Sequence, residues 1–263
     1  MDELRGRVQA LERAGFGAGA GLENGGVRAL DGADIDAGLP WGGLPRGALH
    51  EVAGRRDAAP AGFAAALLAR LGGHTAVNGA ADGAGGRAEI VLWCQTSLEA
   101  HEAGALHGPG IAAFGLDRRR LIVLGVRRPV DLLWAMEEGL RCPGVGAVLG
   151  EVDEIDLRAS RRLQLAAEAG GAAGLLLRPR LDDLGVSAAL TRWRVTPVSG
   201  PADRSRPLPT RPIGASWAVD LWRCRGGAPR QWKLEWDEQA FRFAVAPALA
   251  DGSADAGAQA LSA

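Results

Sequence analysis

Hydrophobic and polar residues follow two different rhythms along this chain of 263 residues. In the first three quarters, short apolar runs alternate with stretches that repeat apolar residues at helical spacing. The runs predict strands at 48–53, 89–94, 120–124, 145–150 and 174–178. The stretches between them predict helices at 60–71, 98–107, 129–140 and 157–169. Because these strands show no polar alternation, we expect a mostly parallel sheet that is covered on both faces by helices.

The rhythm changes to a period of two after about residue 190. Apolar and polar residues alternate at 191–195, 216–224, 232–236 and 241–245. Such alternation is typical of antiparallel strands with one solvated face. The fold class predicted from the sequence is therefore α/β, with C-terminal antiparallel strands that extend a mostly parallel, helix-flanked sheet.

Changes in composition divide the chain into four parts. We expect an N-terminal helix and loop at 1–40, an α/β core at 41–198, the antiparallel strands at 199–247 and a disordered tail at 248–263. Leu4, Val8 and Leu11 have helical spacing, which predicts a short helix that docks on a partner or on its own domain. The Pro-rich stretch 199–212 predicts a long exposed loop.

Composition and charge exclude several classes of protein. Hydrophobic residues make up 47% of the chain and the formal net charge is -1, so no bulk charge draws it to nucleic acid or to anionic lipid. The N-terminus lacks the apolar core of a signal peptide, and no run approaches the roughly 20 apolar residues of a membrane span. We therefore expect a cytoplasmic protein.

The cysteines and histidines do not form a recognisable metal site. The three cysteines, Cys94, Cys142 and Cys224, lie far apart and are expected to be buried free thiols. His101 and His107 are six residues apart, which does not place them on one helical face. We expect no metal and no cofactor.

The loop after the first buried strand has the length of a phosphate-binding loop but not its chemistry. A P-loop reads GxxxxGK[ST], and its lysine and hydroxyl serve the phosphates and the magnesium ion. With Gly54 as the first glycine, Ala59 stands at the second, Pro60 at the lysine and Ala61 at the hydroxyl residue. Pro60 also removes a backbone N–H from the loop. The sequence therefore predicts a degenerate P-loop without tight Mg-ATP binding.

Two further positions were considered for nucleotide chemistry. Gln95 follows an apolar run where a catalytic glutamate would activate water, and an amide cannot take that proton. Glu151 follows another run where a magnesium-associated aspartate would lie, or it belongs to the acidic N-terminus of the next helix. The sequence predicts no catalytic residue.

Several longer stretches carry a family resemblance. Residues 44–54, LPRGALHEVAG, resemble the segment that leads into the P-loop of RecA. The stretches PGIAAFGLD (109–117), LWAMEEGLR (133–141) and ASRRLQLAAE (159–168), followed by LEWD (234–237), resemble the ImuA family, which is also labelled RecA-like or SulA-like. The resemblance spans about residues 40–245 and makes 41–198 a RecA-like core.

The resemblance implies an accessory role in SOS-induced translesion DNA synthesis. It implies an ImuB-like partner, which is an inactive Y-family polymerase homologue, and an indirect link to an error-prone replicative-type polymerase. RecA and single-stranded DNA are further candidate partners. The alternatives left open are a divergent RecA-type ATPase that binds DNA and a SulA-like inhibitor of cell division.

Arginines near the later strands are the candidate DNA contacts. Residues 155–242 hold 15 Arg or Lys and nine Asp or Glu, whereas the whole chain is nearly neutral. Arg178, Arg180, Arg192 and Arg194 follow or lie on successive strands and could clamp phosphates, with Trp193 stacking on a base. The alternative is a solvated strand face with Trp193 in the core.

Overall fold

The computed structural model describes residues 26–55, 58–73, 89–104, 106–181, 184–198 and 216–245. The predicted N-terminal helix at 1–14, the loop at 199–212 and the tail at 248–263 lie outside the described residues. Within the described ranges, none of the helices combines the length and the hydropathy that crossing a membrane requires.

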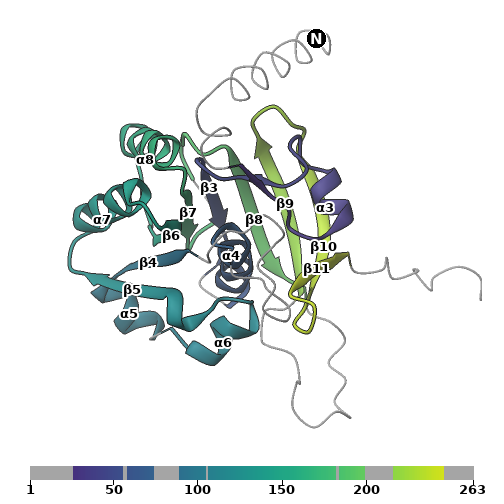
Figure 1. The fold of residues 1–263 in the computed structure, drawn as a ribbon, viewed down its shortest axis with the longest axis horizontal. Coiled ribbons are helices and arrows are strands. Elements are labelled where there is room, and N and C mark those ends of the chain that lie inside the picture. The colour runs from purple at the N-terminus through teal and green to yellow at the C-terminus, as the bar shows by residue number, and fades with distance from the viewer. Residues whose placement is uncertain are drawn as a thin grey trace, which may run out of the picture.

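A nine-stranded sheet runs through the molecule in the order β11-β10-β9-β8-β3-β7-β6-β4-β5 (Figure 1). The strands from β8 to β5 pair in parallel, and β9, β10 and β11 continue the sheet beyond β8 as antiparallel strands. The predicted fold class is confirmed. The strands are β3 (Leu49–Ala53), β4 (Ile90–Thr96), β5 (Leu121–Val126), β6 (Val145–Glu151), β7 (Ala173–Arg178), β8 (Thr191–Pro197), β9 (Ser216–Cys224), β10 (Arg230–Asp237) and β11 (Arg242–Val245).

Helices cover the two faces of the sheet with separate cores. Val52 of β3 belongs to one apolar cluster and Leu49 to the other, because alternate residues of a strand point to opposite faces. The first cluster packs α4 (Ala58–Leu71), α6 (Gly108–Ala113) and α3 (Ala33–Ala37) against the sheet, including the antiparallel strands. The second packs α7 (Pro129–Arg141) and α8 (Leu157–Gly170), which lie side by side in Figure 1.

Several elements differ from the sequence prediction. The predicted helix at 98–107 is α5 (Ser97–Ala103), and α6 follows it as a separate helix capped by the His107 side chain, which accepts from the Gly110 amide. Residues 26–40, expected to be loop, include α3 and pair β1 (Val27–Arg28) with β2 (Leu44–Pro45). A short 3-10 helix (Arg118–Arg120) precedes β5. These elements are too short to show a periodic pattern.

Strand β5 is not buried on both faces, contrary to the prediction. Ile122 is 52% exposed and Val123 is 45% exposed. The reason is position, because β5 is the last strand of the sheet and only one neighbour, β4, pairs with it. The fully buried strands β3 and β7 have a neighbour on each side.

A buried histidine links the central strands by a directional chain of hydrogen bonds. His50 Nε2 donates to the Pro45 carbonyl (2.9 Å), so Nδ1 is the acceptor of the Thr191 hydroxyl (2.8 Å). The same hydroxyl accepts from the Trp193 indole (2.8 Å). Burial lowers the pKa of His50 to about 4, since a charge there would be cut off from water.

This lowered pKa predicts a loss of stability in mild acid. The unfolded chain takes up a proton on His50 near pH 6.5, whereas the folded chain resists it until about pH 4. We expect roughly 3 kcal/mol of unfolding free energy to be lost between these values. Urea titrations of the wild type and of His50→Asn at several pH values check this. In His50→Asn the unfolding free energy should no longer fall with pH by this amount, whereas in His101→Asn, a change at an exposed histidine, it should still do so.

Arg70 of α4 ties two strained turns to the core. Its guanidinium donates to the Asp31 carboxylate and to the Phe241 carbonyl, and its side chain is only 4% exposed. Asp31 and Phe241 have positive φ angles of 56° and 48°, and no other non-glycine residue in the described part of the chain does. A phenylalanine in this left-handed region costs about 1–2 kcal/mol. Arg70 therefore helps to hold both turns in place.

Arg70→Met should lower the free energy of unfolding by about 2 kcal/mol. Methionine keeps the apolar stem of the side chain but provides no donor for the two turns. Arg119→Met is the matched control, because the Arg119 side chain is 89% exposed and its pair with Asp117 contributes little. Chemical denaturation measures both; equal losses for the two variants would contradict the role assigned to Arg70.

Candidate functional site at the carboxyl edge of the central strands

The carboxyl ends of β3, β7 and β8 form the edge where an α/β sheet of this kind binds its ligands. Strand β3 lies between β7 and β8. The chain that leaves β3 proceeds toward β4, and the chain that leaves β7 crosses to β8 on the other side of β3. Such a reversal of direction is the usual position of a ligand crevice. The residues of the predicted degenerate P-loop and three of the candidate arginines, Arg178, Arg180 and Arg194, lie at or near this edge. Arg192 is the second residue of β8 and pairs with Glu51 in the middle of β3.

The two ends of the loop predicted to be a degenerate P-loop, Gly54 and Pro60, are in contact. Gly54 donates its backbone N–H to the Arg178 carbonyl (3.0 Å) as the loop begins. A Cβ atom added to Gly54 would lie 2.7 Å from the Pro60 ring and 2.7 Å from the Val195 carbonyl oxygen. Ala59 and Pro60 are buried and Ala61 is half-buried. The pyrrolidine ring thus packs on the first glycine, at the position where a P-loop carries its lysine.

Gln95 and Glu151, the two other positions that bear on nucleotide chemistry, both lie within strands of the sheet. Gln95 lies inside β4 rather than after it, and its side chain is buried. Glu151 is the last residue of β6, and its carboxylate accepts from the Trp93 indole (2.6 Å). Asp156, not Glu151, caps α8, because its carboxylate accepts from the Ala159 amide (2.6 Å).

A buried ion cluster joins the three central strands. The Oε1 atom of Glu51 in β3 forms ion pairs with Arg192 of β8 (2.8 Å) and with Arg178 of β7 (3.5 Å). All three side chains are at most 2% exposed. Burial lowers the pKa of Arg178, and the charge of Glu51 opposes that shift. One carboxylate thus faces two guanidinium groups away from water.

Backbone carbonyls complete the solvation of the two cations. Arg192 donates to the carbonyls of Gly185 (2.9 Å) and Leu184 (3.0 Å). Arg178 donates twice to the Asp153 carbonyl, at 3.0 and 2.7 Å. The segment after β7 is thereby bound to the sheet edge. Among the described residues, Glu51 Oε2 has no partner.

Two of the four arginines predicted as candidate DNA contacts are buried, and two are partly exposed. Arg178 and Arg192 lie in the interior, where a phosphate cannot reach them. Arg180 and Arg194 are 45% and 43% exposed, but they pair with Glu154 (3.2 Å) and Asp220 (3.9 Å). The alternative expectation for Trp193 is confirmed, since its side chain is fully buried.

Trp222 lies between the buried and the exposed arginines. The guanidinium carbons of Arg192 and Arg194 lie 4.2 and 4.7 Å from the centre of its ring. Cation–π contacts of this kind are worth about 0.5–2 kcal/mol. The Trp222 ring is thus a shared neighbour of the buried Arg192 and the partly exposed Arg194.

The three cysteines differ in their exposure. Burial raises the pKa of the Cys94 and Cys224 thiols to about 12, whereas Cys142 is exposed, contrary to the prediction. No cluster of three or more His, Cys, Asp or Glu side chains occurs in the ranges that the structure describes.

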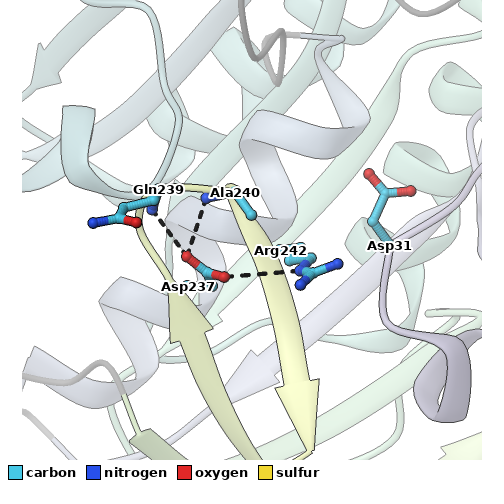
Figure 2. A pocket seen from close by; sticks show the side chains of 5 residues that line it. All are labelled: Asp31, Asp237, Gln239, Ala240 and Arg242. Carbon is cyan, nitrogen blue, oxygen red and sulfur yellow. Dashed lines mark hydrogen bonds and ion pairs between the residues drawn. The ribbon is translucent and has the colours of Figure 1, made fainter.

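The hollow in Figure 2 lies beside the turn between β10 and β11. The Asp237 carboxylate accepts there from the amides of Gln239 and Ala240, both at 3.0 Å, and lies 3.8 Å from Arg242. These bonds stabilise the turn rather than leave acceptors free for a ligand.

Sequence analysis missed the role of Glu51. A signal was present, because a carboxylate inside the apolar run ALHEVA must find a partner when the strand is buried. Nothing in the sequence identified Arg178 and Arg192 as those partners, since they follow 127 and 141 residues later.

Comparison with known proteins adds two close matches. The chain is 35% identical over 224 residues to Protein ImuA of Caulobacter vibrioides strain NA1000 / CB15N, a similarity that covers 78% of this chain and 81% of the relative. Protein ImuA of Caulobacter vibrioides strain ATCC 19089 / CIP 103742 / CB 15 is similar to the same extent. No family model matches the chain.

Glu51→Gln should lower the free energy of unfolding by about 3–5 kcal/mol, because it leaves two buried cations without a counter-charge. Glu154→Gln makes the same chemical change in the exposed pair with Arg180 and should cost less than about 1 kcal/mol. Adding Arg192→Met to Glu51→Gln should recover part of the loss. Urea denaturation of the three variants tests this, and similar stabilities for the two Gln variants would refute it.

Proposed function

The chain belongs to the ImuA family, and we propose that it acts as a non-catalytic RecA-like adaptor in SOS-induced translesion DNA synthesis. Membership of the family supports a role in SOS mutagenesis. In the proposed role the protein binds an ImuB-like polymerase homologue in the cytoplasm and through it reaches an error-prone replicative-type polymerase. RecA and single-stranded DNA remain candidate further partners.

One observation carries the non-catalytic part of this proposal. The ring of Pro60 packs on Gly54, and Ala61 stands where a magnesium-binding hydroxyl would be. A triphosphate held there would lack the lysine that neutralises it and one of the backbone amides that cradle it. The buried Glu51 cluster supports the same conclusion, since the charges at this edge are engaged with one another.

The adaptor role predicts a partner and no nucleotide. Full-length tagged protein purified from DNA-damaged cells should bring down an ImuB-like protein, and the same sample should hold no stoichiometric ATP or ADP. Titration calorimetry should give no saturable heat at Mg-ATP concentrations up to about 1 mM. A Kd of that size corresponds to a binding free energy of only about 4 kcal/mol. RecA, titrated in parallel, is the positive control.

Two outcomes would overturn the proposal. Stoichiometric nucleotide or saturable Mg-ATP binding would favour the divergent ATPase. Capture of the cell-division polymer without any translesion protein, together with filamentous cells on overexpression, would favour the division inhibitor.

A further inference from the structure

Helix α7 carries two apolar stripes, and only one of them faces the sheet. Leu132, Met136 and Leu140 are buried in the core beneath the helix. Val130 and Trp134, one turn apart, are each 62% exposed. The sequence pattern places these two residues with Leu133 on one stripe of the helix. In the structure Val130 and Trp134 are exposed, whereas Leu133 is half-buried and packs against the core.

This second stripe forms one wall of a groove between α7 and α8. Val130, Leu133 and Trp134 line it from α7, and Ala159 and Leu163 line it from α8. The groove encloses about 470 Å³. Trp134 is the exposed aromatic residue of this groove, and tryptophan is among the residues most enriched at binding hot spots.

An ion network fixes the spacing of the two helices. Glu137 of α7 is bonded to Arg162 of α8 and to Arg141 of its own helix (2.7 Å). Because the Glu137 side chain is only 10% exposed, this link belongs to the body of the protein. The groove is therefore present before anything binds, which lowers the entropic cost of binding.

The charges at the rim indicate the chemistry of the partner. Both acids of the groove are engaged, Glu137 by two arginines and Asp156 by the Ala159 amide. Arg158 lines the groove, and Arg161, one turn further along α8, lies just outside its lining. Both are exposed, and neither has an ion-pair partner in the part of the chain that the structure describes. The rim therefore offers free positive charge along one side of an apolar floor.

We propose that the α7–α8 groove binds an amphipathic helix of a partner protein, with apolar residues one turn apart on Trp134 and acidic residues toward Arg158 and Arg161. This proposal rests on the adaptor role and names its binding surface. The N-terminal segment 1–14 fits the groove less well, because its three acids and three arginines give it no acidic excess. A second copy would bring the same arginines together across a symmetric contact.

Fluorescence anisotropy with a designed helical peptide tests the groove on the full-length protein. The probe carries leucines at positions i, i+4 and i+7 and glutamates along one flank, and a second probe has lysines in place of the glutamates. The glutamate peptide should bind at least tenfold more tightly. Trp134→Ala should weaken the binding of the glutamate peptide about tenfold or more. Leu165→Ala should not weaken it, because Leu165 is an exposed apolar residue on α8 that does not line the groove.

Charge reversal and partner capture complete the test. Arg158→Glu with Arg161→Glu should weaken the glutamate peptide and strengthen the lysine peptide. Equal binding of the two peptides, or full affinity in Trp134→Ala with an unchanged thermal midpoint, would refute the proposal. Two further outcomes would also refute it. A wild-type dimer that is lost in Trp134→Ala would assign the groove to a second copy. Tighter peptide binding after deletion of residues 2–14 would assign the groove to the chain's own N-terminal segment.

The groove and the adaptor role fail in different ways. If wild type and Trp134→Ala capture the same translesion proteins from damaged cells, the groove proposal is wrong and the adaptor role stands. If wild type captures none while the peptide results hold, the adaptor role is wrong and the groove retains its specificity for acidic helices.

Discussion

The buried cluster of Glu51, Arg178 and Arg192 is the interaction on which the arrangement of the sheet edge depends. It joins β7, β3 and β8 at the point where the parallel part of the sheet ends and the antiparallel part begins. Two cations around one carboxylate are tolerated only because carbonyls of the chain after β6 and β7 supply further acceptors. The cluster therefore fixes both the strands and the connections that cover their ends.

The same cluster explains why this edge differs from a ligand crevice. A crevice at the reversal point of an α/β sheet needs polar groups directed at an absent molecule. Here the polar groups are directed at one another, and Pro60 packs where the loop would otherwise surround a phosphate. Binding a triphosphate would require the loop to move off Gly54 and a new counter-charge to enter.

Local pattern was enough to predict the sheet, but not the environment of individual charges. Apolar runs identified β6 and β7 because burial on both faces disfavours polar residues, and they identified β3 despite its buried His50 and Glu51. Arg192 alternates with Trp193 just as a solvated residue would, and only the distant Glu51 makes its burial possible. The apolar stripe containing Trp134 was visible in the sequence, yet periodicity does not say which of two stripes meets the sheet. The exposure of β5 likewise follows from its place in the strand order, which the pattern of one strand does not contain.

Stability and recognition are consequently assigned to different parts of one scaffold. The edge that would hold a nucleotide is filled with internal salt bridges, and such pairs add specificity of structure more than free energy. The α7–α8 face has the opposite character, because its apolar residues are exposed and its ion network spans the groove without filling it. The link between Glu137 and Arg162 across the two helices holds such a groove in one shape. A rigid groove loses little entropy on binding, so a short amphipathic helix can be held by a few apolar contacts and a flank of arginines.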